Sequence, residues 1–310
     1  MISSETIGNS DRNEGLHLAT SDAHFARIMV ATDFSNPAAM ALKMAIAIGE
    51  IFDSEILLVH AVAPFMYATG DGPITPEMLD AALDSAKEEM KLLVASEQRL
   101  NGLRLQTVVA CSSAIELIEK IASEQKVNLI AVGSHGASGL ERLLLGSVAE
   151  TILRKAACPV LIAGPHCHSE QHPLRYILFA TDLETTGLRA AQYATALAER
   201  GRGHLTLLHV IDKKQKIPGT QSEIIEKNRQ QQLRSLLPAD VDLFCTPTLR
   251  LEYGPTAEVI SAVAESESAS LVVVGLHRRL ALADHAPWST LSHVIREAKC
   301  GVLGVQSHLP

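Results

Sequence analysis

Three glycines and a serine stand where an apolar run gives way to a helical pattern. Gly133 and Gly136 follow the run 129–132, and the pair Gly146-Ser147 comes ten residues later. Glycine lets a ligand approach the backbone closely, so that amide N–H groups can point at an anion, and the start of a helix adds partial positive charge. These residue types predict a polyphosphate site with few cationic side chains, although each glycine by itself is also typical of an ordinary turn.

The spacing Gly-x2-Gly-x9-Gly-Ser resembles the nucleotide-binding signature of the universal stress protein family. The Ser-His-Gly turn at 134–136, the Leu-Leu-Leu-Gly-Ser block at 143–147 and the Cys-Pro-Val-Leu segment at 158–161 follow one another in the family's order. The spacing differs from the commoner phosphate loops, Gly-x4-Gly-Lys-Ser/Thr and Gly-x-Gly-x2-Gly after a first strand. The resemblance implies that the motif holds the ribose and phosphates of ATP.

The resemblance also implies roles for the residues of a candidate nucleotide site. Asp33 accepts a hydrogen bond from adenine or its surroundings, or else only caps a helix. The backbone of Ala61 faces adenine. Gly133 and Gly136 lie along ribose and phosphate, while the N–H groups of 146–148 and the serine hydroxyl bind the phosphates. The full candidate set is Ala31, Thr32, Asp33, Ala61, Gly133, Gly136, Gly146, Ser147 and Val148.

The ligand implied by the resemblance is ATP, with Mg²⁺ as a candidate companion of the triphosphate. AMP or another adenine nucleotide is an alternative. No carboxylate cluster in the sequence indicates a dedicated Mg²⁺ site.

Apolar runs and helical patterns alternate in the order β-α-β-α-β-α-β-α-β. We expect Asn36 to cap the first helix and Pro37 to take its first position. With right-handed crossovers, this order builds a parallel sheet with helices on both faces, and ligands bind at the carboxyl ends of the strands. The expected strands are 28–32, 56–62, 103–110, 129–132 and 160–163, and the expected helices are 37–49, 77–98, 113–125 and one from about 140 that contains 146–147.

The whole unit occurs twice. Residues 177–182 repeat 28–33 at an offset of 149, and from Ser112 onward the offset is 142. The chain therefore reads as an internal pseudo-dimer. The resemblance implies that its last strands, 160–163 and 301–305, pair with each other, and a homodimer of two chains is a further expectation.

The expected fold class is α/β, with two Rossmann-like domains of the adenine nucleotide alpha hydrolase-like type, each a five-stranded parallel sheet with helices on both faces. The expected organisation is a flexible tail at 1–24, domain 1 at 25–165, a linker at 166–173 and domain 2 at 174–310.

The two copies differ in the glycine motif. Gly136 becomes Arg278, Gly139 becomes Ala281 and Gly146 becomes Trp288. We expect that domain 2 cannot bind ATP in the same manner. The alternative is that the segment 277–279, His-Arg-Arg, binds another anion there.

Composition narrows the function classes. A hydrophobic fraction of 47% is ample for two cores, and a net charge of -8 argues against a nucleic-acid-binding surface. No apolar stretch is long enough to span a bilayer, and the polar segment 1–25 lacks a signal-peptide core. The five scattered cysteines indicate a reducing cytoplasm rather than a disulfide framework.

Other reactive side chains have plainer interpretations. His60 and His135 recur in domain 2, where the glycine motif is broken, so a structural role is favoured over catalysis. The His- and Cys-containing segment 166–172 is read as a solvated linker rather than a metal site.

The sequence therefore predicts a cytoplasmic, universal stress protein-like module that binds an adenine nucleotide, has an unidentified protein partner and carries out at most weak ATP hydrolysis. Two alternatives remain: a slow ATPase or phosphotransferase, and an interaction protein for which nucleotide is incidental.

Overall fold

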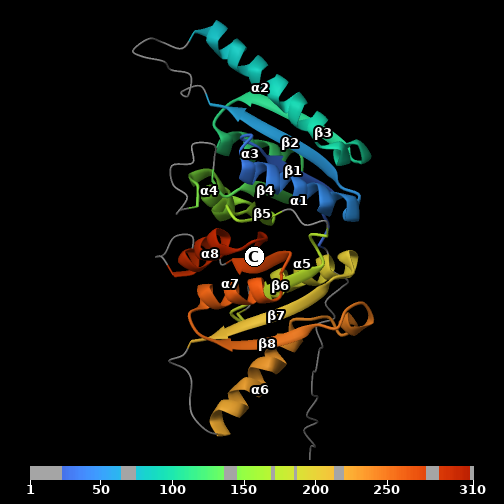
Figure 1. The fold of residues 1–310 in the computed structure, drawn as a ribbon, viewed down its shortest axis with the longest axis vertical. Helices are drawn as coiled ribbons and strands as arrows, with labels where there is room; N and C mark the ends of the chain where they lie inside the picture. Colours follow the sequence, from blue (N-terminus) through green and yellow to red (C-terminus); the bar gives the residue numbers. More distant parts are fainter. Residues whose placement is uncertain are drawn as a thin grey trace, which may run out of the picture.

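The two copies build one continuous sheet. The computed structural model describes residues 23–63, 75–135, 145–168, 172–184, 187–212, 220–276 and 286–307, without the side chains of 220–222 and 286–288. Five strands come from each copy, and we call the two halves domain 1 (β1 to β5) and domain 2 (β6 to β10). Domain 1 forms the upper part of Figure 1 and domain 2 the lower part, with β5 at the boundary.

Domain 1 follows the expected order of elements. Its helix α1 is capped by Ser35, whose hydroxyl accepts a hydrogen bond from the Ala38 amide, so the expected cap at Asn36 is wrong by one residue. The elements are β1 (Arg27–Ala31), α1 (Asn36–Phe52), β2 (Glu55–Val62), α2 (Pro76–Ser96), the 3₁₀ helix η2 (Gln98–Gly102), β3 (Arg104–Cys111), α3 (Ala114–Glu124), β4 (Leu129–Gly133), α4 (Ser147–Lys155) and β5 (Val160–Ala163).

Domain 2 repeats this order, as the sequence offset predicts. Its elements are β6 (Tyr176–Ala180), α5 (Gly187–Gly201), β7 (His204–Ile211), α6 (Thr220–Ser235), the 3₁₀ helix η4 (Val241–Leu243), β8 (Thr248–Tyr253), α7 (Thr256–Ser266), β9 (Leu271–Leu276), α8 (Ala286–Glu297) and β10 (Gly301–Gln306).

The ten strands lie in the order β3-β2-β1-β4-β5-β10-β9-β6-β7-β8. Every pairing within a domain is parallel, whereas β5 and β10 pair antiparallel, with Leu161 opposite Leu303. The predicted pairing of the two last strands is therefore confirmed. In each domain the strand order reverses beside the first strand, at β1/β4 and β6/β9, where ligands of such sheets bind.

Helices cover both faces of the sheet, and each face has one core cluster that crosses the domain boundary. Helices α1 and α5 supply residues to one cluster, together with α2 and α6. Helices α3, α4, α7 and α8 supply the other. Odd and even residues of a strand point to opposite faces of the sheet, so each buried strand contributes side chains to both clusters. The sequences of these strands are therefore continuous apolar runs.

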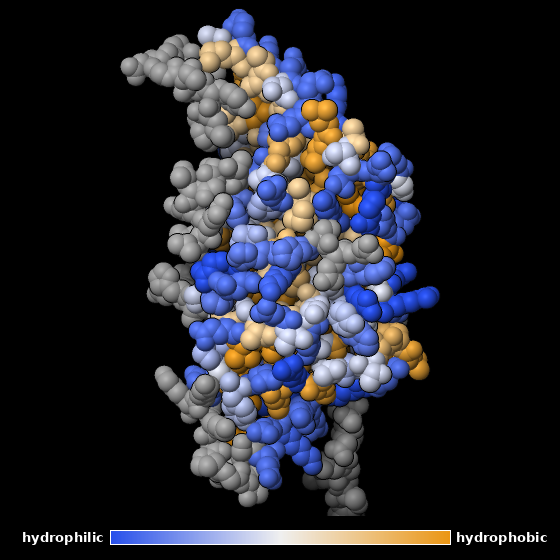
Figure 2. Space-filling view, in the orientation of Figure 1, coloured by the Kyte–Doolittle hydropathy of each residue, from blue (hydrophilic) through white to orange (hydrophobic). Residues whose placement is uncertain are grey.

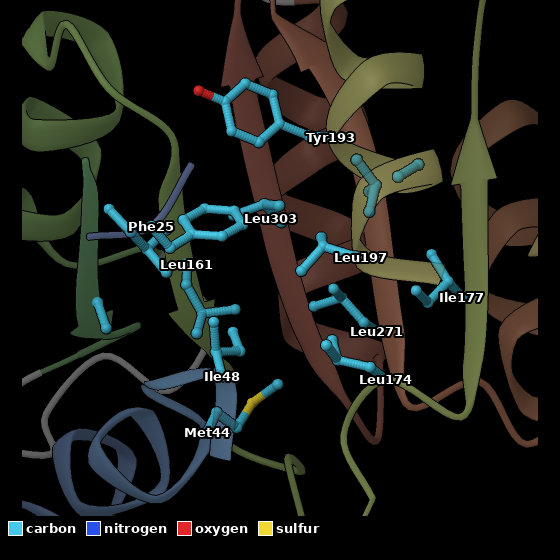
Figure 3. Close-up of a cluster of buried hydrophobic side chains, with 14 of the residues drawn as sticks. Phe25, Met44, Ile48, Leu161, Leu174, Ile177, Tyr193, Leu197, Leu271 and Leu303 are labelled. Carbon is cyan, nitrogen blue, oxygen red and sulfur yellow. The ribbon is translucent and has the colours of Figure 1, made fainter. Parts of the chain in front are cut away.

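Phe25 lies at the centre of the cluster between α1 and α5. Its side chain is fully buried, with ring centroids 4.9 Å from Phe52 and 5.6 Å from Tyr193 of domain 2. Figure 3 shows Phe25 and Leu161 on one side of Leu303, and Leu197, Leu271 and Leu174 of domain 2 on the other. Phe25 is the first residue of the expected domain 1, and residues 1–22 of the expected tail lie outside the described residues.

The linker also contributes to the domain contact. Cys167 is 6% exposed, with its Sγ 3.8 Å from Sδ of Met44, so reading the linker as solvated is wrong for this residue. Two glycines allow the domains to approach. A Cβ on Gly164 would lie 2.0 Å from the carbonyl oxygen of Ile295, and one on Gly301 would lie 2.4 Å from Cε of Met44.

On the face of the molecule drawn in Figure 2, hydrophobic residues reach the surface in separate patches among hydrophilic ones. None of the described helices combines the length and the apolar character needed to cross a membrane.

The Gly164 contact predicts a specific sensitivity at the domain boundary. Gly164→Ala places a methyl group against a backbone carbonyl that cannot move aside. We expect the free energy of unfolding to fall by about 1–3 kcal/mol. Urea unfolding followed by circular dichroism measures the change. Gly102→Ala is the matched control, because nothing lies within 4 Å of its added Cβ. Equal midpoints for the two variants would contradict the prediction.

Candidate functional site

The turn after β1 is a tight hydrogen-bonded unit. The Thr32 hydroxyl accepts a hydrogen bond from the Phe34 amide at 3.0 Å, and Phe34 adopts a left-handed φ of 64°. Asp33 Oδ1 accepts hydrogen bonds from the amide and the hydroxyl of Ser35, at 3.1 and 2.5 Å. Asp33 therefore holds Ser35, which caps α1, and the interpretation of Asp33 itself as the cap is wrong.

The same turn is built after β6. The Thr181 hydroxyl accepts from the Leu183 amide at 3.0 Å, Leu183 has a φ of 67°, and Asp182 Oδ1 accepts from the Glu184 amide at 2.9 Å. The repeated sequence therefore specifies a repeated geometry at the switch point of each domain.

A histidine on the neighbouring strand supports each turn. His60 Nδ1 lies 2.8 Å from the Thr32 carbonyl oxygen, and His209 Nδ1 lies 2.9 Å from that of Thr181. Because a carbonyl only accepts, Nδ1 carries the proton in both rings. These hydrogen bonds agree with the structural role expected for His60. His135 contacts its sequence neighbour instead, with Nδ1 2.9 Å from Ser134 Oγ.

Gly133 is the last residue of β4 and lies against the first turn of α1. A Cβ at this position would lie 2.8 Å from the Ala38 amide nitrogen and 2.9 Å from Cβ of Pro37. Both are parts of the first turn of α1, so glycine is required here by packing alone. The close approach of α1 to the backbone is thus by itself a reason for the first glycine of the motif.

Gly146 is the N-cap of α4, not a residue inside the helix as expected. Its amide donates to the Ser134 carbonyl at 2.7 Å, which ties the start of α4 to the end of β4. A Cβ on Gly146 would lie 3.1 Å from that oxygen. Among the described residues, no side chain caps this helix, and the first intrahelical bond runs from the Glu150 amide to the Gly146 carbonyl.

The amides of Ser147, Val148 and Ala149 precede the first amide with an intrahelical partner. Such N–H groups, together with the helix dipole, suit an anion. Ser147 is exposed and Val148 half-buried.

The remaining candidate residues lie on two neighbouring strands. Ala31 is the last residue of β1 and Ala61 the last but one of β2, and both pack against the core cluster of α3 and α4, as does Val148. Thr32 is buried and Asp33 exposed. Gly136 lies outside the described residues. The structure thus brings Ala31, Ala61, Gly133 and Val148 to the same edge of domain 1.

Domain 2 begins its last helix differently. Ser289 is the counterpart of Ser147, yet α8 begins at Ala286, three residues before it. In a regular helix the Thr290 amide then bonds to the Ala286 carbonyl, so the amide equivalent to that of Val148 already has an intrahelical partner. The carbonyl of Leu276, the counterpart of Ser134, accepts from the Ser307 amide at 3.0 Å.

A cavity of about 380 Å³ lies at the carboxyl ends of β6, β7 and β9. Helices α7 and α8 complete its wall through residues such as Ile260 and Leu291. Six of the nine candidate positions of domain 1 have counterparts that line it: Ala180, Thr181, Asp182, Val210, Gly275 and Thr290.

Sequence reasoning placed the residues at the strand ends but missed the walls supplied by α7 and α8. The repeat offset is the signal in the sequence that could have identified these wall residues. It equates Ile118 with Ile260 and Ala149 with Leu291, and both domain 1 residues belong to the core cluster behind Ala31 and Ala61.

Cysteine and metal chemistry find little support in the described residues. Burial raises the pKa of the Cys158 thiol to about 11, so this thiol stays protonated near neutral pH. In the part of the chain that the structure describes, no group of three His, Cys, Asp or Glu side chains could hold a metal ion.

The packing of Gly133 predicts a loss of stability that does not depend on ligand. Gly133→Ala pushes the start of α1 away from β4, and we expect nucleotide-free protein to lose about 1–3 kcal/mol of unfolding free energy. Thermal and urea unfolding of nucleotide-stripped protein measure this. Unchanged stability combined with lost ligand binding would instead mean that the glycine serves the ligand.

His209 predicts a pH dependence of stability. Burial lowers its pKa, against the opposing hydrogen bond to Thr181. The unfolded chain then binds a proton below about pH 6.5 that the folded chain excludes, so stability falls as the pH drops from there towards the folded pKa, by at most about 1.4 kcal/mol per pH unit. Above about pH 6.5 the imidazole of His209 is neutral in both states and does not change the stability.

Urea midpoints measured from pH 8 to pH 5 test this dependence. The His209→Asn variant keeps a donor for the Thr181 carbonyl but does not titrate. Its urea midpoint should therefore fall less steeply with decreasing pH than the midpoint of the wild type. Parallel curves would contradict the assignment.

Comparison with known proteins agrees with this architecture. The model of the Universal stress protein family matches residues 24–164 and 173–306. Universal stress protein MJ0531 of Methanocaldococcus jannaschii is 32% identical over 140 residues, which cover 44% of this chain and 81% of the relative. A universal stress protein of Mycolicibacterium smegmatis is 24% identical over 285 residues, or 90% of this chain and 96% of the relative.

The crystal structure of a universal stress protein from Archaeoglobus fulgidus shares the fold, with a TM-score of 0.67 and 19% identity over 91% of this chain and 98% of that chain. The family model spans both halves of the sheet described above. The chain therefore belongs to the universal stress protein family and carries two of its domains in tandem.

Proposed function

We propose that domain 1 binds ATP at the carboxyl ends of β1, β2 and β4 and acts as a regulatory nucleotide-binding module of the cytoplasm. One observation carries the proposal: the Gly146 amide is anchored to the Ser134 carbonyl, so α4 starts beside the switch point with a glycine cap. The amides of its first turn and the Ser147 hydroxyl supply donors for phosphate oxygens.

The other candidate residues suit the base and ribose. Ala31 and Ala61 offer small apolar surfaces on adjacent strands, and Asp33 offers an exposed carboxylate at the end of β1. The cavity found at the equivalent place in domain 2 supports the assignment, because its walls are counterparts of these residues. Gly133 serves this site indirectly, by letting α1 pack against β4.

A route for regulation runs from α4 into domain 2. The side-chain amide of Gln306, the last residue of β10, donates to the Leu153 carbonyl in α4. The Gln306 carbonyl in turn accepts from the Arg189 guanidinium of α5 at 2.8 Å. A ligand that orders the first turn of α4 therefore acts on a helix that contacts the domain boundary, which suits a conformational output better than catalysis.

The domain limits that go with this proposal are 25–165 for the nucleotide-binding domain, 166–173 for the linker and 174–310 for its partner domain. A homodimer and an unidentified protein partner remain part of the proposal as recipients of the signal. Mg²⁺ would accompany the triphosphate through its oxygens, and AMP is the competing ligand.

Nucleotide analysis of freshly purified protein tests the proposal. The protein is denatured and the released compounds are identified by chromatography and mass spectrometry, and stripped protein is then titrated with ATP and Mg²⁺ by calorimetry. We expect one ATP per chain. AMP in its place would change the ligand, steady phosphate release would favour the slow ATPase, and no nucleotide in either experiment would overturn the proposal.

A matched pair of serine variants localises the site. Ser147→Ala removes a hydroxyl donor to a charged group, a loss of about 1.5–3 kcal/mol or roughly tenfold to 150-fold in affinity. Ser289→Ala, at the counterpart position in domain 2, should leave ATP affinity unchanged. Gly146→Trp, which copies domain 2, should abolish ATP binding. Equal effects of the two serine variants would place the nucleotide elsewhere.

A further inference from the structure

We propose that the cavity of domain 2 binds a purine nucleoside, that is, a base and ribose without a phosphate. The inference rests on the proposed function of domain 1, because it takes domain 2 as a copy that keeps the base-and-ribose half of the site and has lost the phosphate half. Its ligand class differs both from ATP and from the anion that the segment 277–279 suggested.

The cavity is a formed site of suitable size. Its volume of about 380 Å³ falls at the small end of the range for small-molecule pockets. Apolar walls come from Val210, Ile260 and Leu291, on three different elements, and can hold a flat heterocycle between them. Polar lining residues include Thr181 and Asp182, which begin the turn after β6, and Thr256 and Thr290 of the two helices.

The polar lining combines acceptors with threonine hydroxyls, which can donate or accept. His209 is 8% exposed, and its Nδ1–H is used by the Thr181 carbonyl, so Nε2 of the neutral ring can accept a hydrogen bond. The carboxylates of Asp182 and Glu184 also line the cavity and are acceptors. An exocyclic amino group and ribose hydroxyls are donors that complement such a wall, whereas a phosphate is an acceptor.

Three differences from domain 1 disfavour a phosphate. Helix α8 begins before Ser289, so the amide of Thr290 is engaged within the helix. Glu184 replaces Ser35, which adds a negative charge at the rim. The Leu276 carbonyl, whose counterpart anchors Gly146 in domain 1, is bonded to the Ser307 amide instead.

The size of the wall residues points the same way. Several lining residues are larger than their domain 1 counterparts, among them Val210 for Ala61, Leu291 for Ala149 and Leu276 for Ser134, whereas Gly187 and Val294 are smaller than Ala38 and Ile152. The larger side chains narrow the site beside β7, β9 and α8. A nucleoside is the part of a nucleotide that this reduced, phosphate-repelling site still fits.

Equilibrium dialysis of the full chain with radiolabelled adenosine tests the proposal, and unlabelled AMP and ATP serve as competitors. Val210→Phe fills the cavity of domain 2, and Ala61→Phe is its matched counterpart in domain 1. We expect Val210→Phe to weaken adenosine binding by at least about tenfold and Ala61→Phe to leave one adenosine per chain bound. AMP should compete for this adenosine at least about tenfold more weakly than unlabelled adenosine.

A second filling variant guards against misfolding. Thr256 is an exposed residue at the start of α7 that also lines the cavity, so Thr256→Trp can narrow the site without disturbing the core. It should reduce adenosine binding as Val210→Phe does, in protein whose circular dichroism spectrum is unchanged. Glu184→Ser, which copies domain 1, should bring the affinity for AMP closer to that for adenosine.

The two proposals fail separately. If the wild-type protein binds adenosine but not ATP, the function proposed for domain 1 is overturned and the nucleoside proposal for domain 2 still holds. The nucleoside proposal is overturned if adenosine does not bind, if only Ala61→Phe removes it, or if AMP binds domain 2 as tightly as adenosine. The last outcome would favour the anion site at 277–279.

Discussion

The antiparallel pairing of β5 with β10 is the constraint on which the rest of the structure depends. Both strands are buried over their whole length and apolar except for Gln306 at the end of β10, so each would be an aggregation-prone edge if its domain stood alone. Joining them removes both edges and merges the two sheets. The hydrophobic clusters on the two faces then extend across the boundary, where Phe25, Met44 and Leu153 of domain 1 meet residues of domain 2.

This shared core lets the two halves diverge without losing their common geometry. The turn after the first strand, with its threonine hydroxyl, aspartate and supporting histidine, has the same hydrogen bonds in both domains. The divergence lies where α4 and α8 begin. Because α8 begins three residues earlier than α4 relative to the repeat, the amide of Thr290 bonds within its helix, whereas the amide of Val148 precedes the first intrahelical bond of α4.

The glycine motif is thus not a single functional unit. Gly133 is needed because the start of α1 lies against the end of β4, and Gly146 because its backbone comes close to the Ser134 carbonyl. The first requirement belongs to the packing of α1 against the sheet, and the second to the position at which α4 begins. Retention of Gly275 in domain 2, where Trp288 replaces the second glycine, agrees with this division.

The sequence by itself determined the order of elements and the internal repeat, because hydrophobic periodicity and motif spacing are local signals. The pairing of the last strands followed from the family resemblance, and the strand-end residues of the site stay a prediction. Tertiary structure decided what depends on distant contacts. Phe25 directly follows a polar segment, and its burial depends on Tyr193, which packs against it from the other domain. The helix after Gly146 starts later than its pattern suggested, because the Ser134 carbonyl holds that glycine outside the helix. The cavity of domain 2 needs walls from α7 and α8, and no local pattern states how closely those helices approach the sheet.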